Sequence, residues 1–204
     1  ELNEFLKYQL QEITNGYFID INISRALVGV KQFYDNRYWH IGKAPYTLDA
    51  LKEISIDNFK LFRALKGKNK KCLVLDCDNT LWGGIVGEDG IKGIKLGPNY
   101  PGSTYLEFQQ EILSLYHRGV ILALCSKNNE LDIWDVMDNN SQMLIKREHI
   151  SSAMVNWKDK ASNIQKIARE LNIGLDSLVF IDDNEFEINL VKQMLPSVET
   201  IHLP

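Results

Sequence analysis

The sequence predicts an α/β protein in which helices cover both faces of a Rossmann-like parallel sheet, preceded by a small, mostly helical α/β segment. Three observations support this fold class. Unbroken apolar runs recur between residues 72 and 201, amphipathic stretches of helical spacing separate them, and a polar segment divides them from the N-terminal part. Strands of a parallel sheet are buried on both faces and therefore appear as continuous apolar runs.

The expected elements follow from this alternation. The apolar runs predict strands at residues 72–76, 120–125, 154–155 and 178–182, and a last strand at 198–201. The spacing of apolar residues between them predicts helices at 103–118, 129–138, 160–171 and 185–194. In the N-terminal part, the same criteria predict helices at 2–14, 23–29 and 47–65, and a short strand at 17–21.

Residues 66–71, Lys-Gly-Lys-Asn-Lys-Lys, are polar and basic. A solvated linker fits this composition better than the alternative, a nucleic-acid-binding patch. The segment also lacks the GxxxxGK[ST] spacing of a phosphate-binding loop. We therefore expect an N-terminal segment over residues 1–66 and a second domain over residues 67–204.

Composition excludes several classes of protein. The chain has 204 residues, 45% hydrophobic and 25% charged, which is typical of globular proteins. Its 23 basic and 27 acidic residues give a net charge of −4, which argues against a nucleic-acid partner. No apolar stretch is long enough to cross a membrane. The three cysteines lack CxxC spacing, and the chain starts Glu-Leu-Asn-Glu rather than with a signal segment, so we expect a fragment of a cytoplasmic protein.

Polar side chains gather where the apolar runs end. Ligands bind beyond the carboxyl ends of the strands in an open parallel sheet, so these side chains are expected to converge. They are Asp76, Asp78 and Thr80 after the first run, Ser126 and Lys127 after the second, Asp182 and Asp183 after the last, and Lys160 at the start of the preceding helix.

Four carboxylates at two strand ends would repel one another in a partly desolvated cleft. A hard divalent cation with oxygen ligands offsets that repulsion, and a site that also leaves room for phosphate suits Mg²⁺. The alternative is that these residues cap helices, which is most plausible for Asp183 or Asn184 taken alone. Strand alternation points Asp76 and Asp78 the same way, as a nucleophile and a proton shuttle require.

These residues resemble the four motifs of the haloacid-dehalogenase (HAD) superfamily, in the superfamily's order. Residues 75–81, Leu-Asp-Cys-Asp-Asn-Thr-Leu, look like motif I, and Cys-Ser-Lys-Asn at 125–128 like motif II. Lys160 matches motif III, and Ile-Asp-Asp-Asn at 181–184 the acidic motif IV. Residues 81–90 and 156–160 add a closer likeness to the FkbH-like members, subfamily IIIC. There an SGNH-hydrolase-like domain often comes first, so residues 1–66 are expected to be its C-terminal part.

The resemblance implies a role for each matching residue. Asp76 would attack phosphorus and form an aspartyl-phosphate, and Asp78 would act as the proton shuttle. Mg²⁺ would be held by Asp76, the Asp78 backbone carbonyl and Asp182, with Asp183 in support. Ser126 would donate to the phosphoryl group and Lys160 would offset its charge. Thr80, Trp82, Lys127 and Asn128 are the remaining substrate-binding candidates.

The segments between the motifs are too short for a large cap domain, which predicts an open site. Such a site suits a macromolecular substrate or a partner domain that acts as a lid. The Trp82-Gly83-Gly84 segment is the candidate mobile flap, because glycine permits unusual backbone angles. Trp82 would either stack on substrate or anchor the core.

FkbH-like proteins are associated with loading a glyceryl unit from 1,3-bisphosphoglycerate onto an acyl carrier protein through a cysteine thioester. By this resemblance Cys125, next to Ser126, is the candidate thiol, and its alternative is a place in the core. The alternative activity is a generic phosphatase that acts on a small or macromolecular phosphomonoester. A phospho-receiver module and an inactive scaffold are less favoured, because receivers order these residues differently and all four motifs are intact.

Overall fold

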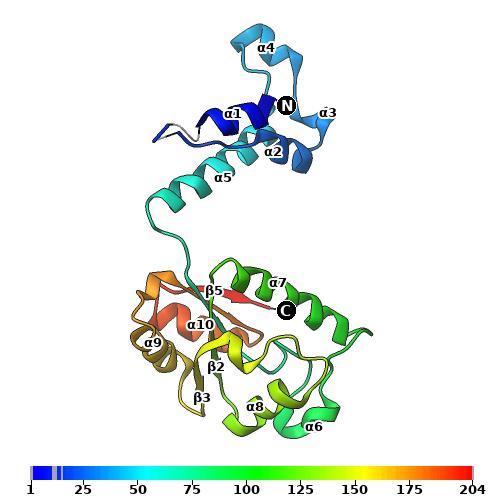
Figure 1. Ribbon diagram of the computed structural model, residues 1–204, viewed down its shortest axis with the longest axis vertical. Coiled ribbons are helices and arrows are strands. Elements are labelled where there is room, and N and C mark those ends of the chain that lie inside the picture. Colours follow the sequence, from blue (N-terminus) through cyan, green and yellow to red (C-terminus); the bar gives the residue numbers. More distant parts are fainter. Residues whose placement is uncertain (1, 11–12, 15, 204) are drawn as a thin grey trace. The chain divides into compact units, whose positions relative to one another are not determined.

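The computed structural model describes residues 2–10, 13–14 and 16–203, and it divides into two compact units, Glu1–Asn69 and Lys70–Pro204 (Figure 1). Whether the first unit is part of an SGNH-hydrolase-like domain stays a prediction. Among the described residues, no helix is both long enough and apolar enough to cross a membrane.

The first unit is built from helices. They are α1 (Leu2–Leu10), α2 (Ile21–Val28), α3 (Val30–Phe33), α4 (Asn36–Gly42) and α5 (Leu48–Leu65). The longest, α5, begins after Thr47, whose hydroxyl accepts a hydrogen bond from the Ala50 N–H, as the sequence predicts. Helix α2 packs against α5, where the Ser24 hydroxyl donates to Asp57 at 2.8 Å.

The strand expected at residues 17–21 is absent, and this part of the prediction is wrong. Residues 17–20 have no regular structure, and α2 begins at Ile21. The carboxylate of Asp20 accepts from the Asn22 N–H at 3.1 Å and starts the helix instead. A short apolar run forms a strand only where another strand pairs with it, and the described residues of this unit supply none. Residues 11–12 of the expected first helix lie outside the described part.

The second unit contains the predicted parallel sheet. Its strands are β1 (Cys72–Leu75), β2 (Ile121–Ser126), β3 (Ile150–Val155), β4 (Leu178–Asp182) and β5 (Glu199–His202). They pair in the order β3-β2-β1-β4-β5, and every pair is parallel. In this register Leu75 lies opposite both Leu124 and Ile181, which brings the carboxyl ends of β1, β2 and β4 to one level.

Helices cover both faces of the sheet, as expected. Helices α6 (Val86–Gly93), α7 (Gly102–His117) and α8 (Glu130–Asn139) pack on one face, in a core that includes Leu73 and Leu75 of β1. Helices α9 (Lys160–Glu170) and α10 (Glu185–Met194) pack on the other, with Cys72 and Val74. Alternate residues of β1 therefore pack into the cores on opposite faces of the sheet.

Two elements differ from the prediction in ways that the chemistry explains. Strand β3 starts at Ile150, four residues before the expected run, because an edge strand tolerates the serines at 151 and 152. Helix α6 lies in what the sequence indicates is a loop, and Gly90, at φ 66°, interrupts it. Between β1 and β2 the chain forms only α6, α7 and short connections, so this described segment adds no separate cap domain.

Candidate active site

A cleft of about 320 Å³ lies at the carboxyl ends of the central strands. Strand β1 leads into Asp76, β2 ends at Ser126, and α9 begins at Lys160. All three side chains line the cleft, together with Asp183 after β4. The order of the strands thus brings together residues that lie more than a hundred positions apart in the sequence.

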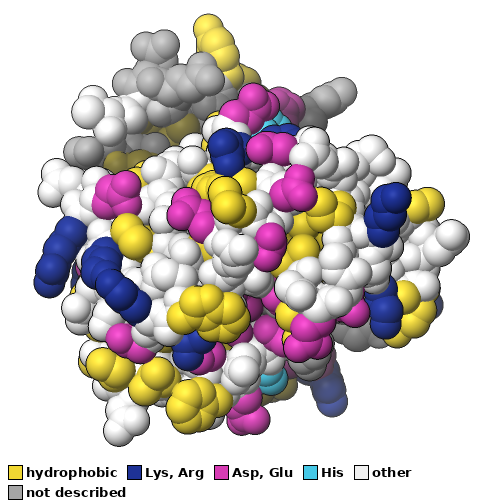
Figure 2. Space-filling model, turned by 90° about the horizontal axis from the view of Figure 1, so that it is seen from below, with side chains coloured by type: hydrophobic (Ala, Val, Ile, Leu, Met, Phe, Trp, Pro, Cys, Tyr) yellow, Lys and Arg dark blue, Asp and Glu magenta, His cyan; other side chains and the backbone are white. Residues whose placement is uncertain are grey.

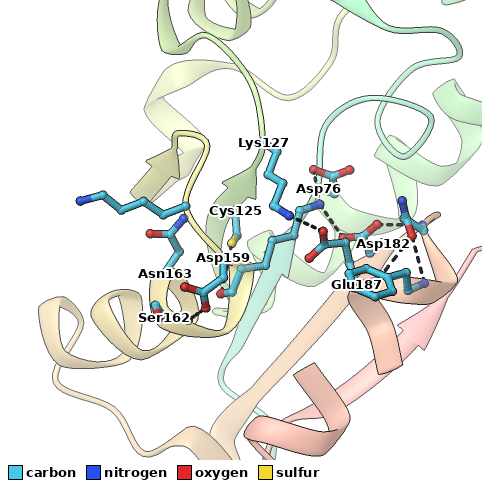
Figure 3. Close-up of polar contacts among 12 residues, drawn as sticks. Asp76, Cys125, Lys127, Asp159, Ser162, Asn163, Asp182 and Glu187 are labelled. Carbon is cyan, nitrogen blue, oxygen red and sulfur yellow. Dashed lines mark hydrogen bonds and ion pairs between the residues drawn. The ribbon is translucent and has the colours of Figure 1, made fainter. Parts of the chain in front are cut away.

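Three carboxylates lie close together at the cleft, and one lysine contacts two of them. Oxygen atoms of Asp76, Asp182 and Asp183 all lie within 4.8 Å of one another. The Lys160 ammonium lies 2.6 Å from Asp182 Oδ2 and 2.9 Å from Asp76 Oδ1 (Figure 3). The first contact is a hydrogen bond, and the second is an ion pair outside hydrogen-bonding angles. One lysine leaves this cluster with surplus negative charge, so the donor set fits a hard divalent cation such as Mg²⁺.

The pKa values in this cluster show its electrostatic cost. Burial raises the pKa of Asp182, and the nearby Asp76 carboxylate raises it further. The same two causes raise the pKa of Asp183. Burial alone would lower the pKa of Lys160, but Asp76 and Asp182 raise it above its usual value, so this lysine stays charged. Both raised carboxyl pKa values mark a place where added positive charge is favourable.

The carboxylate of Asp78 lies apart from the three clustered carboxylates and is held by three donors. Its Oδ1 accepts from the Trp82 indole N–H at 2.9 Å and from the Val86 N–H at 3.0 Å, and its Oδ2 accepts from the Asn128 amide at 2.6 Å. Burial raises the pKa of Asp78, while these hydrogen bonds oppose the rise. Asn79 follows in the left-handed region at φ 51° and turns the chain away from the strand.

Lys127 and Glu187 form an ion pair beside the phosphoryl-binding candidates. Lys127 Nζ lies 2.5 Å from Glu187 Oε1, and the Glu187 side chain is only 7% exposed (Figure 3). The other oxygen, Oε2, is buried without a hydrogen-bond partner. Sequence reasoning missed Glu187, whose one signal is a charged residue in the first turn of the helix after the acidic pair.

The comparison with family models decides the classification of this unit. Residues 71–199 match the model of the NLI interacting factor-like phosphatases. The chain belongs to this family. The fold of Lys70–Pro204 is accordingly that of a HAD-superfamily phosphatase, as the sequence predicts.

One solved structure is similar to this chain over its whole length. The chain is 40% identical, at a TM-score of 0.87 over 100% of its length, to the N-terminal part of the protein BF1531 from Bacteroides fragilis, which contains a phosphatase domain complexed with Mg. It covers 54% of that structure's chain, about half its length. A HAD family enzyme from Bacteroides thetaiotaomicron, complexed with magnesium and inorganic phosphate, is 12% identical (TM-score 0.49) over 67% of this chain and 95% of its own. No curated protein matches.

In this NLI interacting factor-like phosphatase unit, three of the expected substrate-binding residues lie elsewhere. Trp82 and Thr80 are buried, and neither side chain lines the cleft. Asn128 is buried as well, and both ends of its amide are engaged, with Asp78 and with the Asn129 N–H. Trp82 and Asn128 donate hydrogen bonds to Asp78, and Thr80 lies in the interior, so a substrate-binding role for these three residues stays a prediction that gains no support from their positions. Lys127 lines the cleft.

The segment expected to be a mobile flap makes several hydrogen bonds. Gly83 exchanges two backbone hydrogen bonds with Lys95, at 3.1 and 2.7 Å, and the Gly84 N–H donates to the Asn79 side chain at 2.8 Å. With Trp82 fully buried between these contacts and the core, the segment is anchored at every residue.

The three thiols of the phosphatase unit are buried in its cores. Cys125 faces the α9 and α10 side, does not line the cleft, and donates to the Lys160 backbone carbonyl at 3.7 Å. Burial raises the pKa of its thiol, as it does those of Cys72 and Cys77. The catalytic prediction for Cys125 is therefore not supported by its position.

Of the two residues that the sequence offered as helix caps, Asn184 caps a helix and Asp183 does not. The Asn184 side chain accepts from the Phe186 and Glu187 N–H groups and caps α10. Asp183 instead contributes its carboxylate to the clustered oxygens. Sequence alone could not separate them because both residue types are good caps.

Proposed function

We propose that the Lys70–Pro204 unit is a Mg²⁺-dependent phosphatase that hydrolyses phosphomonoesters through an aspartyl-phosphate on Asp76. The observation that carries this proposal is the cluster of Asp76, Asp182 and Asp183 around Lys160, open to a cleft that also holds Ser126. Membership in a phosphatase family supports it.

The proposed reaction consists of two successive displacements at phosphorus. An Asp76 oxygen attacks phosphorus, the bond to the ester oxygen breaks, and that oxygen takes a proton from Asp78. A water molecule then gives a proton to Asp78 and attacks the same phosphorus, which breaks the bond to Asp76 and releases inorganic phosphate. Ser126 donates a hydrogen bond to a phosphoryl oxygen, and Lys160 balances the charge on Asp76.

The cation would be held by Asp76, Asp182 and Asp183, with the Asp78 carbonyl as the resemblance implies. When bound, Mg²⁺ supplies charge stabilisation to the phosphoryl oxygens. The side chain of Asp78 is left to proton transfer, which agrees with its separate hydrogen bonds to Trp82 and Asn128.

The narrower FkbH-like assignment, and with it the loading of an acyl carrier protein, gains no support from the site. That reaction needs a thiolate near the phosphoryl group, whereas all three cysteines are buried with raised pKa values. We therefore favour hydrolysis of a phosphomonoester over transfer of an acyl group.

Release of inorganic phosphate from 4-nitrophenyl phosphate tests the proposal. Activity is expected with Mg²⁺ and is expected to disappear with a chelator. Asp76→Asn should reduce kcat by about a thousandfold or more, because it removes the nucleophile and one of the clustered charges. Asp138→Asn, which changes an exposed carboxylate on α8, is the matched control and should leave kcat unchanged. Equal rates for the Asp76 variant and the unmodified protein would refute the proposal.

A further inference from the structure

Two apolar side chains stand at the mouth of an otherwise polar cleft. Trp157 is 76% exposed and Ile85 41% exposed, and both line the cleft that contains Asp76 and Ser126. The other side chains that line it are acidic, basic, amide or hydroxyl groups. Figure 2 shows that hydrophobic and acidic side chains lie next to one another on the face it presents.

A hydrogen bond connects the backbone next to Trp157 to the candidate phosphoryl-binding residue Ser126. The Asn156 N–H donates to the Ser126 carbonyl at 3.1 Å, directly before the tryptophan. The Asn156 side chain accepts from the Lys158 N–H and from the amide of Asn163, each at 3.0 Å, and Asn163 is only 1% exposed. A loop fixed on both sides presents its indole outward at a defined place, which a merely solvated loop does not require.

Ile85 is fixed in the same manner on the other segment. Its neighbour Val86 donates its N–H to Asp78, and the Ile85 N–H itself donates to Asp89 at 3.0 Å. The two apolar side chains are thus carried on backbone that is bonded to Ser126 and to Asp78. The backbone that carries them is therefore anchored beside the candidate phosphoryl-binding residue and the candidate proton shuttle.

We propose that Trp157, assisted by Ile85, selects phosphomonoesters whose leaving group carries a planar apolar body, with the indole as the stacking surface. This inference rests on the proposed phosphatase activity and names its substrate class. A cleft of about 320 Å³ is at the lower end of volumes that hold small organic ligands, enough for a phosphoryl group and an attached ring system. Trp157 is a specificity residue here and takes no part in bond making.

The test compares two esters in the full chain with Mg²⁺: 2-naphthyl phosphate, which has a planar body, and glycerol 2-phosphate, which lacks one. Trp157→Ala is expected to raise KM for naphthyl phosphate roughly tenfold, the size of one lost stacking contact together with its buried apolar area. KM for glycerol 2-phosphate should change less than about twofold, and Trp157→Phe should restore most of the naphthyl KM. Leu131→Ala, a similarly exposed residue (75%) on α8 outside the cleft, is the matched control and should change neither.

A binding measurement separates failure of this inference from failure of the phosphatase proposal. Titration with the non-hydrolysable 2-naphthylmethylphosphonate, followed by calorimetry, should give a roughly tenfold weaker affinity for Trp157→Ala. No turnover of these two esters or of 4-nitrophenyl phosphate by the unmodified protein would refute the phosphatase proposal, and the titration would still decide this one. Equal effects of Trp157→Ala on both esters, or unchanged phosphonate affinity, would overturn the proposal and leave Trp157 as part of a protein-docking surface.

Discussion

Glu187 illustrates how a single buried charge can depend on one partner. Its carboxylate is almost fully enclosed, and Lys127 at 2.5 Å is the cation that compensates it. Transfer of a carboxylate out of water is costly unless it is paired, so this contact matters more than an exposed ion pair of the same length. The Lys127 side chain remains 35% exposed, which moderates the effect.

We expect Lys127→Met to lower the free energy of unfolding by about 1–2 kcal/mol, because it leaves the Glu187 carboxylate buried and unpaired. The double variant with Glu187→Gln should recover part of the loss, since the amide carries no charge. Urea denaturation of Lys127→Met, Glu187→Gln, the double variant and the unmodified protein measures the coupling. A double variant no more stable than the single one would contradict this explanation.

At the scale of elements, helices α8, α9 and α10 each begin with a side-chain N-cap. Asn129, Asp159 and Asn184 each accept a hydrogen bond from a backbone N–H of the first turn. These caps begin the helices directly after the loops that carry the site residues, and the cap of α9 lies next to Lys160. A capping residue thus fixes where Lys160 begins the helix.

The stability that the Asp159 N-cap gives to α9 is expected to depend on pH. The Ser162 N–H donates to its carboxylate at 2.7 Å and holds the pKa of Asp159 below its ordinary value. A pKa that is lower in the folded state stabilises the fold fully above the unfolded value of about 3.9, and the contribution is lost as pH falls through the folded pKa.

Asp159→Ala should therefore cost about 1 kcal/mol of stability at pH 7, and less below about pH 3. Asp159→Asn should cost little at pH 7, because asparagine caps equally well. Chemical denaturation at both pH values, with the unmodified protein as reference, gives the difference. A cost for Asp159→Ala that does not shrink in acid would show that the cap works without its charge.

At the scale of the whole molecule, the site belongs to one of the two compact units. The sheet, the clustered carboxylates and the hydrogen bonds to Asp78 all join residues of Lys70–Pro204. Large apolar side chains that are exposed occur mainly in the other unit, for example Phe59 and Phe62 on α5.

A chain of residues 70–204 is therefore expected to fold and to keep the Mg²⁺-dependent phosphatase activity of the full chain within about threefold. Because the site contacts lie inside this unit, neither the sheet nor the cleft loses a partner. Circular dichroism during heating and phosphate release from 4-nitrophenyl phosphate are the measurements. An unfolded or inactive fragment would mean that residues 1–69 complete the fold of the second unit.

The sequence alone determined the parallel sheet, its five strands and the positions of the polar residues, because continuous apolar runs and helical spacing report burial directly. Only the tertiary structure decided which of those polar residues meet. Asp183 reaches the clustered carboxylates while Asn184 caps a helix, and Trp82 turns inward to Asp78 while Trp157 faces outward. Periodicity records whether a side chain is buried, but strand order and register set its neighbours, and Glu187 approaches Lys127 across sixty positions only after the sheet has formed.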